Sequence, residues 1–495
     1  WTNRKLNNIV NCKVNIEMRI LLEIGDKSLE MELGLADKPS SLLMENTYVP
    51  ELPNGTEEGK YLALDLGGTN FRVILVDLEK GRIVNERVKH YHISDELRLN
   101  CGIKLFDFLA ECISEFVIEN GLADRVLPMG FTFSFPMHQH ALDSGILKVW
   151  TKSFACPGVE GKDAVKLLNE AIHRRGDNHV ELICVLNDTT GTLMQGAMLD
   201  KDTAIGLILG TGTNACYLER AERVQHWEVE RHGEKQVVID IEWGAFGDNG
   251  CIDFVKTEFD RTVDEKSLIP KSFTFEKKIG GKFMGELVQV ILCSLTREGH
   301  LFNGIPSDKL LEHGHFRTSF VSGIEEDSIN GTKGNTEKIL DDLGLDYDDD
   351  DVKIVQYICH LVSLRAAQFV AICVSQILIR MSKPQVTVAV DGSLFKFHPR
   401  LRIWMEKYTK LLAPSHPVIT VTSVPLKFFI FQTDEFKIEI IFHLVLTLMN
   451  GIFSFSKLTV RINWRESLVI IQCSLSITTP VTKKSSLFHR NHLIP

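Results

Sequence analysis

The sequence predicts an α/β protein, because short apolar strands alternate with stretches of helical periodicity along most of the chain. Two of the predicted strands run into similar glycine-rich turns, at residues 65–70 and 209–214. The 495 residues, 44% of them hydrophobic, suffice for two or three domains at roughly 150 residues each. This composition excludes a mainly disordered, collagen-like or disulfide-scaffold chain.

The predicted elements follow one another in mixed order. Apolar runs rich in β-branched and aromatic residues predict strands at 61–64, 71–76, 127–133, 181–186 and 203–209. Helical spacing of apolar residues predicts helices at 13–35, at 105–119, from Thr190 onward and at 352–380. The acidic run at 346–351 precedes the last of these helices, and we expect it to form the first helical turn rather than a calcium site.

The net charge and the cysteine content restrict which partners and which cellular compartment the sequence predicts. A formal net charge of −10 argues against nucleic acid as a partner, since non-specific binding needs a broad basic face. Eleven cysteines without a CxxC pair are typical of reduced thiols, so we expect a cytoplasmic protein without a secretory signal. The pairs His138/His140 and His313/His315 lack partners at fixed spacing, and we expect no metal site at either pair.

Residues 421–495 differ in composition from the rest of the chain. They contain one glycine, Gly451, of the 35 in the sequence. Residues 440–456 carry no formal charge, which is at the short limit for a membrane span, and His443 and Asn450 interrupt them. A buried or poorly ordered segment and a membrane anchor remain alternative interpretations.

The two glycine turns are candidate phosphate-binding loops. Each follows an apolar strand and combines glycines with Thr and Asn, so that backbone N–H groups and hydroxyls can reach an anion. A plain hairpin turn is the alternative at each position. Asp65 ends the first strand, where its carboxylate suits Mg²⁺, held directly or through water; the alternative is an aspartate that caps its own turn.

Asn187 and Asp188 end another apolar strand and precede Thr189 and Thr190. A carboxylate at such a strand end can point into a cleft and accept a proton from an attacking hydroxyl, as a general base. It can equally be a helix N-cap, for which Asp is a preferred residue. The residues alone leave these two interpretations open.

A longer motif resembles a known family. MGFTFSFP at 129–136, LD at 142–143 and WTKSF at 150–154 are similar to the sugar-binding signature of the eukaryotic hexokinases. Further segments match that family in the same order: 65–72, 186–189, 210–217, 242–248, 257–261, 285–287, 390–393 and 398–399. The resemblance runs from about Met31 to about Ile419 and contains one such unit, so it is to the single-unit hexokinases and glucokinases rather than to tandem-duplicated ones.

The resemblance implies a two-lobed α/β fold of the actin-like, ribonuclease-H-like ATPase class, with a cleft between a small and a large lobe. It assigns residues 60–190 to the small lobe. The large lobe takes residues 191–420 and the N-terminal helical segment 1–59, and residues 421–495 form a tail outside the family. The implied activity is transfer of a phosphoryl group from ATP, with Mg²⁺, to the 6-hydroxyl of a hexose such as glucose, in the first step of glycolysis.

The resemblance also implies roles for single residues. Asp188 matches the catalytic base, and Lys152 matches a lysine beside the reacting oxygens, where a cation offsets developing charge. The residues implied to hold the sugar are Ser134, Thr151, Lys152, Asn187, Asp188, Asn214, Glu242 and Glu286. The residues implied to hold the nucleotide are Asp65, Gly67, Gly68, Thr69, Asn70, Thr211, Ser363, Gly392 and Ser393. Asp65 is implied to contact Mg²⁺ through water.

Beyond about Ile419 the sequence departs from the family pattern, which continues through a Gly/Ser-rich loop and a last helix beside the adenosine. No such glycine loop follows Thr422. A hexose-binding sensor or scaffold with weak or lost turnover is therefore an alternative function, and an actin-like or chaperone-like ATPase is a second. No apolar N-terminal stretch of the kind that attaches some relatives to mitochondria is visible, so such attachment is not indicated, and the oligomeric state is left open.

Overall fold

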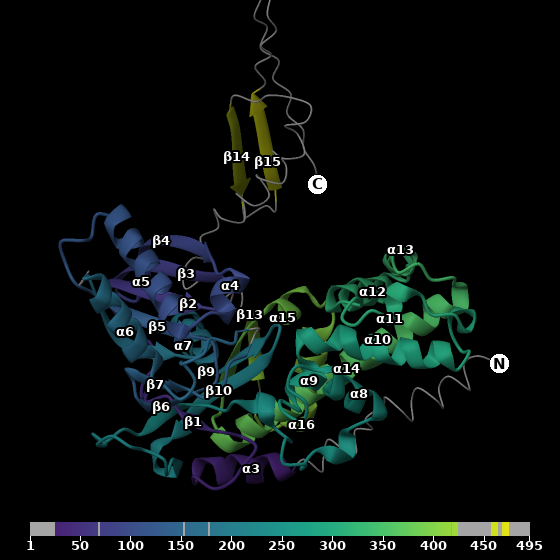
Figure 1. The fold of residues 1–495 in the computed structure, drawn as a ribbon, viewed down its shortest axis with the longest axis horizontal. Helices are drawn as coiled ribbons and strands as arrows, with labels where there is room; N and C mark the ends of the chain where they lie inside the picture. Colours follow the sequence, from purple (N-terminus) through teal and green to yellow (C-terminus); the bar gives the residue numbers. More distant parts are fainter. Residues whose placement is uncertain are drawn as a thin grey trace, which may run out of the picture. The chain divides into compact units, whose positions relative to one another are not determined.

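The computed structural model describes residues 25–67, 70–151, 154–176, 179–416, 418–423, 457–463 and 468–474. Its contacts divide the chain into two units, residues 1–430 and residues 431–495. The described part of the second unit is an antiparallel hairpin of β14 (Lys457–Asn463) and β15 (Leu468–Ser474). The uncharged stretch 440–456 lies outside the described residues. All other elements belong to the first unit (Figure 1).

A five-stranded sheet with its helices forms what we call the small lobe. Its strands are β2 (Gly59–Leu66), β3 (Asn70–Glu79), β4 (Arg82–His92), β5 (Leu127–Phe133) and β8 (Val180–Leu186), in the order β4-β3-β2-β5-β8. The first three strands in that order are antiparallel, and β5 and β8 continue the sheet in parallel. The lobe also contains α4 (Asp95–Leu99), α5 (Gly102–Glu119), α6 (Ala164–Arg175) and a hairpin of β6 (Met137–Ala141) and β7 (Ser144–Leu147).

A six-stranded sheet is the centre of what we call the large lobe. Its strands are β1 (Glu45–Asn46), β9 (Thr203–Leu209), β10 (Thr213–Arg220), β11 (Gln236–Asp240), β12 (Val386–Asp391) and β13 (Val418–Ser423), in the order β1-β11-β10-β9-β12-β13. Neighbours from β1 to β9 are antiparallel, whereas β12 and β13 continue the sheet in parallel.

The two sheets therefore share one arrangement, in which antiparallel strands joined by a tight hairpin are followed by two parallel ones. Both glycine turns occupy the same place in it, since the first joins β2 to β3 and the second joins β9 to β10. The repetition in the sequence is thus a repetition in the structure. This doubled arrangement is that of the actin-like ATPase class and confirms the predicted fold class, and the predicted strands are confirmed as β2, β3, β5, β8 and β9.

Helices fill the large lobe around one long central helix (Figure 1). The helices are α3 (Gly25–Leu35), α7 (Asp188–Leu199), α8 (Glu258–Lys266), α9 (Glu276–Ile279), α10 (Gly281–Arg297), α11 (Asp308–Leu311), α12 (Thr318–Asn330), α13 (Gly334–Asp342), α14 (Asp349–Met381), α15 (Ser393–Phe397) and α16 (Leu401–Leu412). Short 3-10 turns are η1 (Ala221–Arg223), η2 (Trp243–Ala245), η3 (Asp253–Val255) and η4 (Phe302–Gly304).

The predicted helices are confirmed where the structure describes them, as α5, α7 and α14, and the helix predicted at 13–35 is described from Gly25 onward as α3. The acidic run does begin α14: the Asp348 side chain caps it by accepting hydrogen bonds from the backbone N–H groups of Asp350 and Asp351. Helix α14 is long and apolar enough to cross a membrane, but 83% of its apolar window is buried within the protein, as in a core helix.

Each sheet has a hydrophobic core of its own. The small-lobe core gathers residues of β2, β3, β5, α5 and α6 and reaches Met137 and Leu147 of the β6–β7 hairpin. The large-lobe core gathers the six-stranded sheet with α10 and α14. Met31, Leu35 and Met44 belong to the large-lobe core, so the described part of the N-terminal segment packs with that lobe.

Candidate active site

The junction of β8 and α7 positions two predicted site residues. Asn187 is the N-cap of α7: its Oδ1 accepts hydrogen bonds from the backbone N–H and the hydroxyl of Thr189, both at 3.0 Å. Asp188 is the first helical residue, where the helix dipole favours a negative charge. The cap is therefore Asn187, and the Asp188 carboxylate remains partly exposed while Asn187 is buried.

A glycine in β9 brings the start of α7 close to the large sheet. A Cβ on Gly206 would lie 2.6 Å from the carbonyl oxygen of Thr189, so no other residue allows this approach without a shift of the backbone. The Cys216 thiol of β10 donates to the same carbonyl at 3.3 Å. Asp188 is thus held against the six-stranded sheet, although the preceding strand β8 belongs to the small lobe.

Four buried polar side chains meet beside this junction. The Asn187 amide donates to Glu242 Oε1 at 3.2 Å, and the Asn214 amide donates to the same oxygen at 3.2 Å and to Asp240 Oδ1 at 2.7 Å. Asn214 lies on β10, Asp240 ends β11, and Glu242 follows it. The backbone of Glu242 is left-handed, with φ 53°, a conformation that is uncommon outside glycine and is often found at functional sites. We call Asn187, Asn214, Asp240 and Glu242 the acidic cluster.

The acidic cluster is electrostatically unusual. Burial raises the pKa of Glu242 well above its usual value, and the carboxylates of Asp240 and Asp188 raise it further. Burial also raises the pKa of Asp240 to about 7, although the hydrogen bond from Asn214 acts in the opposite direction. Both shifts have the same direction because two neighbouring buried carboxyl groups do not ionise readily together.

The structure places Glu286 in a different setting from the other predicted sugar residues. It lies on α10, and its carboxylate is 3.7 Å from Nε2 of His313. With His313 and Lys266 it lines a cavity of about 60 Å³. Burial raises the pKa of Glu286, and His313 partly offsets the increase.

The sugar signature supplies two more of the predicted positions. Ser134 is buried just after β5, and its backbone N–H donates to the Leu66 carbonyl at 3.3 Å, which ties the signature to β2. Thr151 accepts a backbone hydrogen bond from Phe154 at 3.0 Å. Lys152 lies outside the described residues.

The first glycine turn is described in part. Asp65 is paired across the hairpin with Arg72, whose Nε lies 3.0 Å from the Asp65 carboxylate. Gly67 is described, Asn70 begins β3, and Gly68 and Thr69 lie outside the described residues. Arg72 thus engages the carboxylate that the sequence assigns to water-bound Mg²⁺.

The second glycine turn lies against the other predicted nucleotide residues. Gly392 has φ 118°, and a Cβ there would lie 2.2 Å from the Leu209 carbonyl oxygen, so the chain after β12 passes directly beside the turn. The carbonyls of Gly210 and Thr211 accept hydrogen bonds from the N-terminal N–H groups of α10, at 2.8 and 3.0 Å. Thr211 and Ser393 are exposed, and the structure brings them into one neighbourhood.

Ser363 has a different environment. It is fully buried in α14, and its hydroxyl lies 2.9 Å from Nε2 of His398. In this structure the hydroxyl therefore joins α14 to the segment after α15.

The sequence interpretation missed three residues that shape the site. Asp240 stands two residues before Glu242 at the end of an apolar strand, and that spacing would have indicated a carboxylate on the same face. Arg72 lies opposite Asp65 only once the hairpin register is known. The Glu276 carboxylate accepts the Thr213 backbone N–H at 3.0 Å, a contact between distant parts of the chain for which we find no sequence signal.

Comparison with known proteins identifies the family. Two family models described as hexokinase match residues 12–198 and 204–427. The chain is 43% identical over 406 residues to human Hexokinase-2 and 42% identical over 400 residues to rat Hexokinase-1, which is 80% and 79% of this chain. The chain therefore belongs to the hexokinase family, as the resemblance predicted.

Solved structures agree with this assignment. The Schistosoma mansoni hexokinase complexed with glucose superposes with a TM-score of 0.78 at 36% identity, covering 86% of this chain and 96% of that one. A second hexokinase crystal structure gives a TM-score of 0.71 at 28% identity. The chain spans less than half the length of the two curated relatives, 44% and 43%. The second family model ends at residue 427, a few residues beyond Ile419, near which the sequence resemblance ends.

Proposed function

We propose that the protein is an ATP-dependent hexose kinase that phosphorylates the 6-hydroxyl of a hexose, with glucose as the first candidate, and releases hexose 6-phosphate and ADP. The observation that carries this proposal is the acidic cluster beside Asp188. Four buried polar groups from three separate segments converge there. Membership of the hexokinase family and the likeness to a glucose-complexed relative support the same activity.

The acidic cluster has the chemistry to hold a sugar. A pyranose presents neighbouring hydroxyls that each donate and accept, and amides paired with carboxylates can satisfy both roles. The side chains are preorganised, because Asn187 and Asn214 converge on one oxygen of Glu242. Glu286 would join such a site by the family resemblance, and Ser134, Thr151 and Lys152 by their place in the signature.

Asp188 has the position of a general base. Its carboxylate would accept the proton of the sugar 6-hydroxyl while the hydroxyl oxygen bonds to the γ-phosphorus and ADP leaves. Buried Asn187 fixes the start of α7 by capping it, so the adjacent carboxylate is held in place at low entropic cost.

The residues beside the second turn fit a polyphosphate. A Cβ on Gly210 would lie 3.7 Å from the Gly392 Cα and 3.9 Å from the Ser393 nitrogen, so a side chain at 210 would fill the space beside that amide. Thr211, Gly392 and Ser393 would hold ATP there, and the family resemblance assigns Gly67–Asn70 of the first turn to the same ligand. Mg²⁺, when bound, neutralises charge on the phosphate oxygens, and Asp65 next to Arg72 suits a hydrogen bond to metal-bound water. Cytoplasmic location remains part of the proposal.

The hexose-binding sensor is the weaker alternative, because relatives over most of the chain are named as hexokinases. One experiment separates the two. Asp188→Asn should lower kcat by about 10²- to 10⁴-fold, while glucose still raises the melting temperature, because the acidic cluster is intact. The matched control is Asp200→Asn at the other end of α7, where the side chain accepts from Thr387; it should keep kcat. Glucose binding without turnover in the wild type would favour the sensor.

A further inference from the structure

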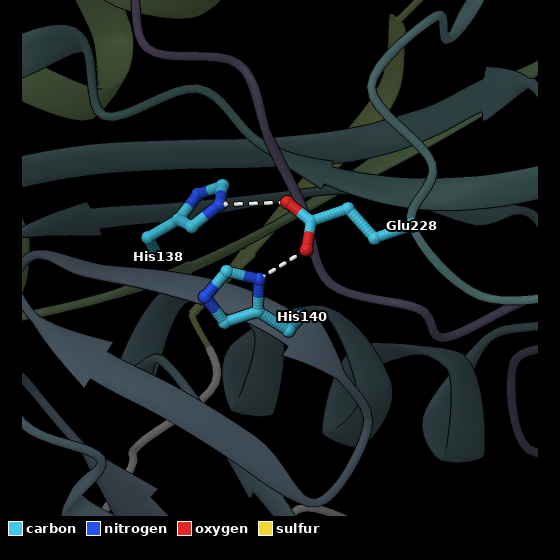
Figure 2. Close-up of side chains that lie close together, drawn as sticks. All are labelled: His138, His140 and Glu228. Atoms are coloured by element: carbon cyan, nitrogen blue, oxygen red, sulfur yellow. Dashed lines mark hydrogen bonds and ion pairs between the residues drawn. The ribbon is translucent and has the colours of Figure 1, made fainter.

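Two histidines of the small lobe meet a glutamate of the large lobe at a place that the proposed function does not use. His138 and His140 are two residues apart on β6, so both side chains stand on one face of the strand. Glu228 lies in the segment between η1 and β11. A ligand atom of each residue lies within 4.8 Å of the others, and Figure 2 shows the Glu228 carboxylate facing both rings.

The donor atoms have the composition of a zinc-class site. His138 Nε2 lies 3.2 Å from one carboxylate oxygen of Glu228, and His140 Nδ1 contacts the other oxygen. The two rings stand edge to face with centroids 4.6 Å apart. Two imidazole nitrogens and a carboxylate oxygen form a donor set that Zn²⁺ favours, whereas Mg²⁺ and Ca²⁺ favour oxygen alone.

Glu45 supports His138 from the opposite side of its ring. The Glu45 carboxylate lies 2.8 Å from His138 Nδ1, and its other oxygen pairs with Lys148. Its side chain is only 7% exposed, so the hydrogen bond is shielded from water. A carboxylate on the far nitrogen is the usual outer partner of a metal-bound histidine, because it fixes the tautomer that leaves Nε2 as the acceptor.

A cation from solvent can reach the site. The side chains of His138, His140 and Glu228 are 32%, 37% and 47% exposed. The Glu228 backbone is held in place, since its N–H donates to the Tyr48 hydroxyl at 3.2 Å. The ligands are thus accessible but attached to ordered elements.

The ligands come from both lobes. Met137, next to His138, belongs to the small-lobe core, whereas Trp227, next to Glu228, packs against the large-lobe core. Glu45 is on β1, directly opposite Asp240 of the acidic cluster in the sheet register. A cation here would therefore connect the two lobes one strand away from the acidic cluster.

We propose that His138, His140 and Glu228 bind a zinc-class divalent cation that ties the β6–β7 hairpin of the small lobe to the large lobe. Glu45 is a positioning residue for His138. The sequence analysis expected no metal at His138 and His140 because it found no third ligand nearby in the chain; the structure brings one from 88 residues away.

The test is a Zn²⁺ titration of the untagged full chain by calorimetry, after removal of metals and without nucleotide or sugar. One equivalent should bind at micromolar concentration, and Co²⁺ in its place should give the strong visible absorption of a four-coordinate site. His140→Gln and Glu228→Gln should each weaken binding by about tenfold or more, and Glu45→Gln should weaken it by about 10- to 100-fold. The control His173→Gln changes an exposed histidine of α6 and should bind like the wild type.

Amide hydrogen exchange supplies a second readout. Zn²⁺ should slow exchange in residues 224–235 of the wild type but not of the double variant His138→Gln/His140→Gln. Unfolding curves measured in chelator establish that each variant is folded. Glu228→Gln changes a half-exposed side chain and keeps both histidines, so it tests the site with little change to the fold. Equal Zn²⁺ affinity in the wild type and the double variant, or wild-type binding only at millimolar Zn²⁺, would overturn the proposal.

Discussion

Two of the buried clusters of charged side chains in the described large lobe are built in opposite ways. In the first, Asp260 receives two hydrogen bonds from Arg365, at 2.8 and 3.0 Å, and lies 3.5 Å from Lys278. In the second, the acidic cluster, Asp240 and Glu242 have amides as hydrogen-bond partners. Both clusters are buried, so the difference lies in how their charge is compensated.

The pKa values of the two clusters move in opposite directions. Burial acts to raise the pKa of Asp260, but Arg365 and Lys278 outweigh it, and the pKa is held well below its usual value. Burial raises the pKa of both Asp240 and Glu242, Asp240 raises the pKa of Glu242 further, and the Asp188 carboxylate raises both. In the first cluster two cations offset the charge of the buried carboxylate, whereas the carboxyl groups of the second have neutral amides as partners. Carboxyl groups with raised pKa values are typical of functional sites, and offset ones of structural ion pairs.

The largest effect on stability should come from breaking the cluster around Asp260. Asp260→Asn leaves two buried cations facing each other, so the free energy of unfolding should fall by about 3–5 kcal/mol. The control Asp253→Asn removes an exposed pair with Lys256 and should cost about 0–1 kcal/mol. Urea unfolding of the three proteins gives the comparison. Equal stability of Asp260→Asn and the control would show that the buried pair is not a structural support.

The largest effect on binding should come from changing the acidic cluster. Glu242→Gln removes the carboxyl group that would ionise when sugar hydroxyls donate to it, so glucose affinity should fall by about 10- to 150-fold, the equivalent of roughly 1.5–3 kcal/mol. The free energy of unfolding should not fall, because an uncompensated buried acid is removed. Calorimetry with glucose and urea unfolding measure the two quantities. Asp260→Asn is the reciprocal control, since it should lose stability and keep glucose affinity.

Glucose binding should depend on pH through the same acids. Hydroxyls that donate to a carboxylate favour its ionised form, so the pKa values of Asp240 and Glu242 should fall on binding. Binding then releases protons, and affinity should rise with pH up to about 7, the pKa to which burial raises Asp240. Calorimetry in two buffers of different ionisation enthalpy measures the proton release. A wild type whose binding heat is the same in both buffers would contradict the raised pKa values.

Much of the fold was predictable because it rests on local patterns. Apolar runs of four to seven residues predicted β2, β3, β5, β8 and β9, and the acidic run predicted the first turn of α14. The glycine turns repeat in the sequence because they join equivalent strands. The long family motif implied the two-lobed class, which periodicity alone does not reach.

The site was predictable in type but not in its partners. The residues alone left Asp188 open between a base and a helix cap, and only the structure shows that Asn187 is the cap. The neighbours of the residues that the sequence singled out, such as Asp240, Arg72 and Glu228, depend on strand register and on contacts between distant segments. A pattern of spacing within one segment carries no information about such contacts.

The smallest expected effect is a pair of opposite pH slopes in stability. A carboxyl group whose pKa is lowered by folding stabilises the folded state at pH values above its pKa in the unfolded state, about 4 for Asp. This stabilisation is lost as pH falls below that value. The stability gap between the wild type and Asp260→Asn should therefore shrink as pH falls below about 4. A raised pKa gives the reverse, so the stability of Asp240→Asn relative to the wild type should increase as pH rises from about 4 through about 7. Urea unfolding at a series of pH values measures both slopes, and slopes of the same sign would remove the contrast between the two clusters.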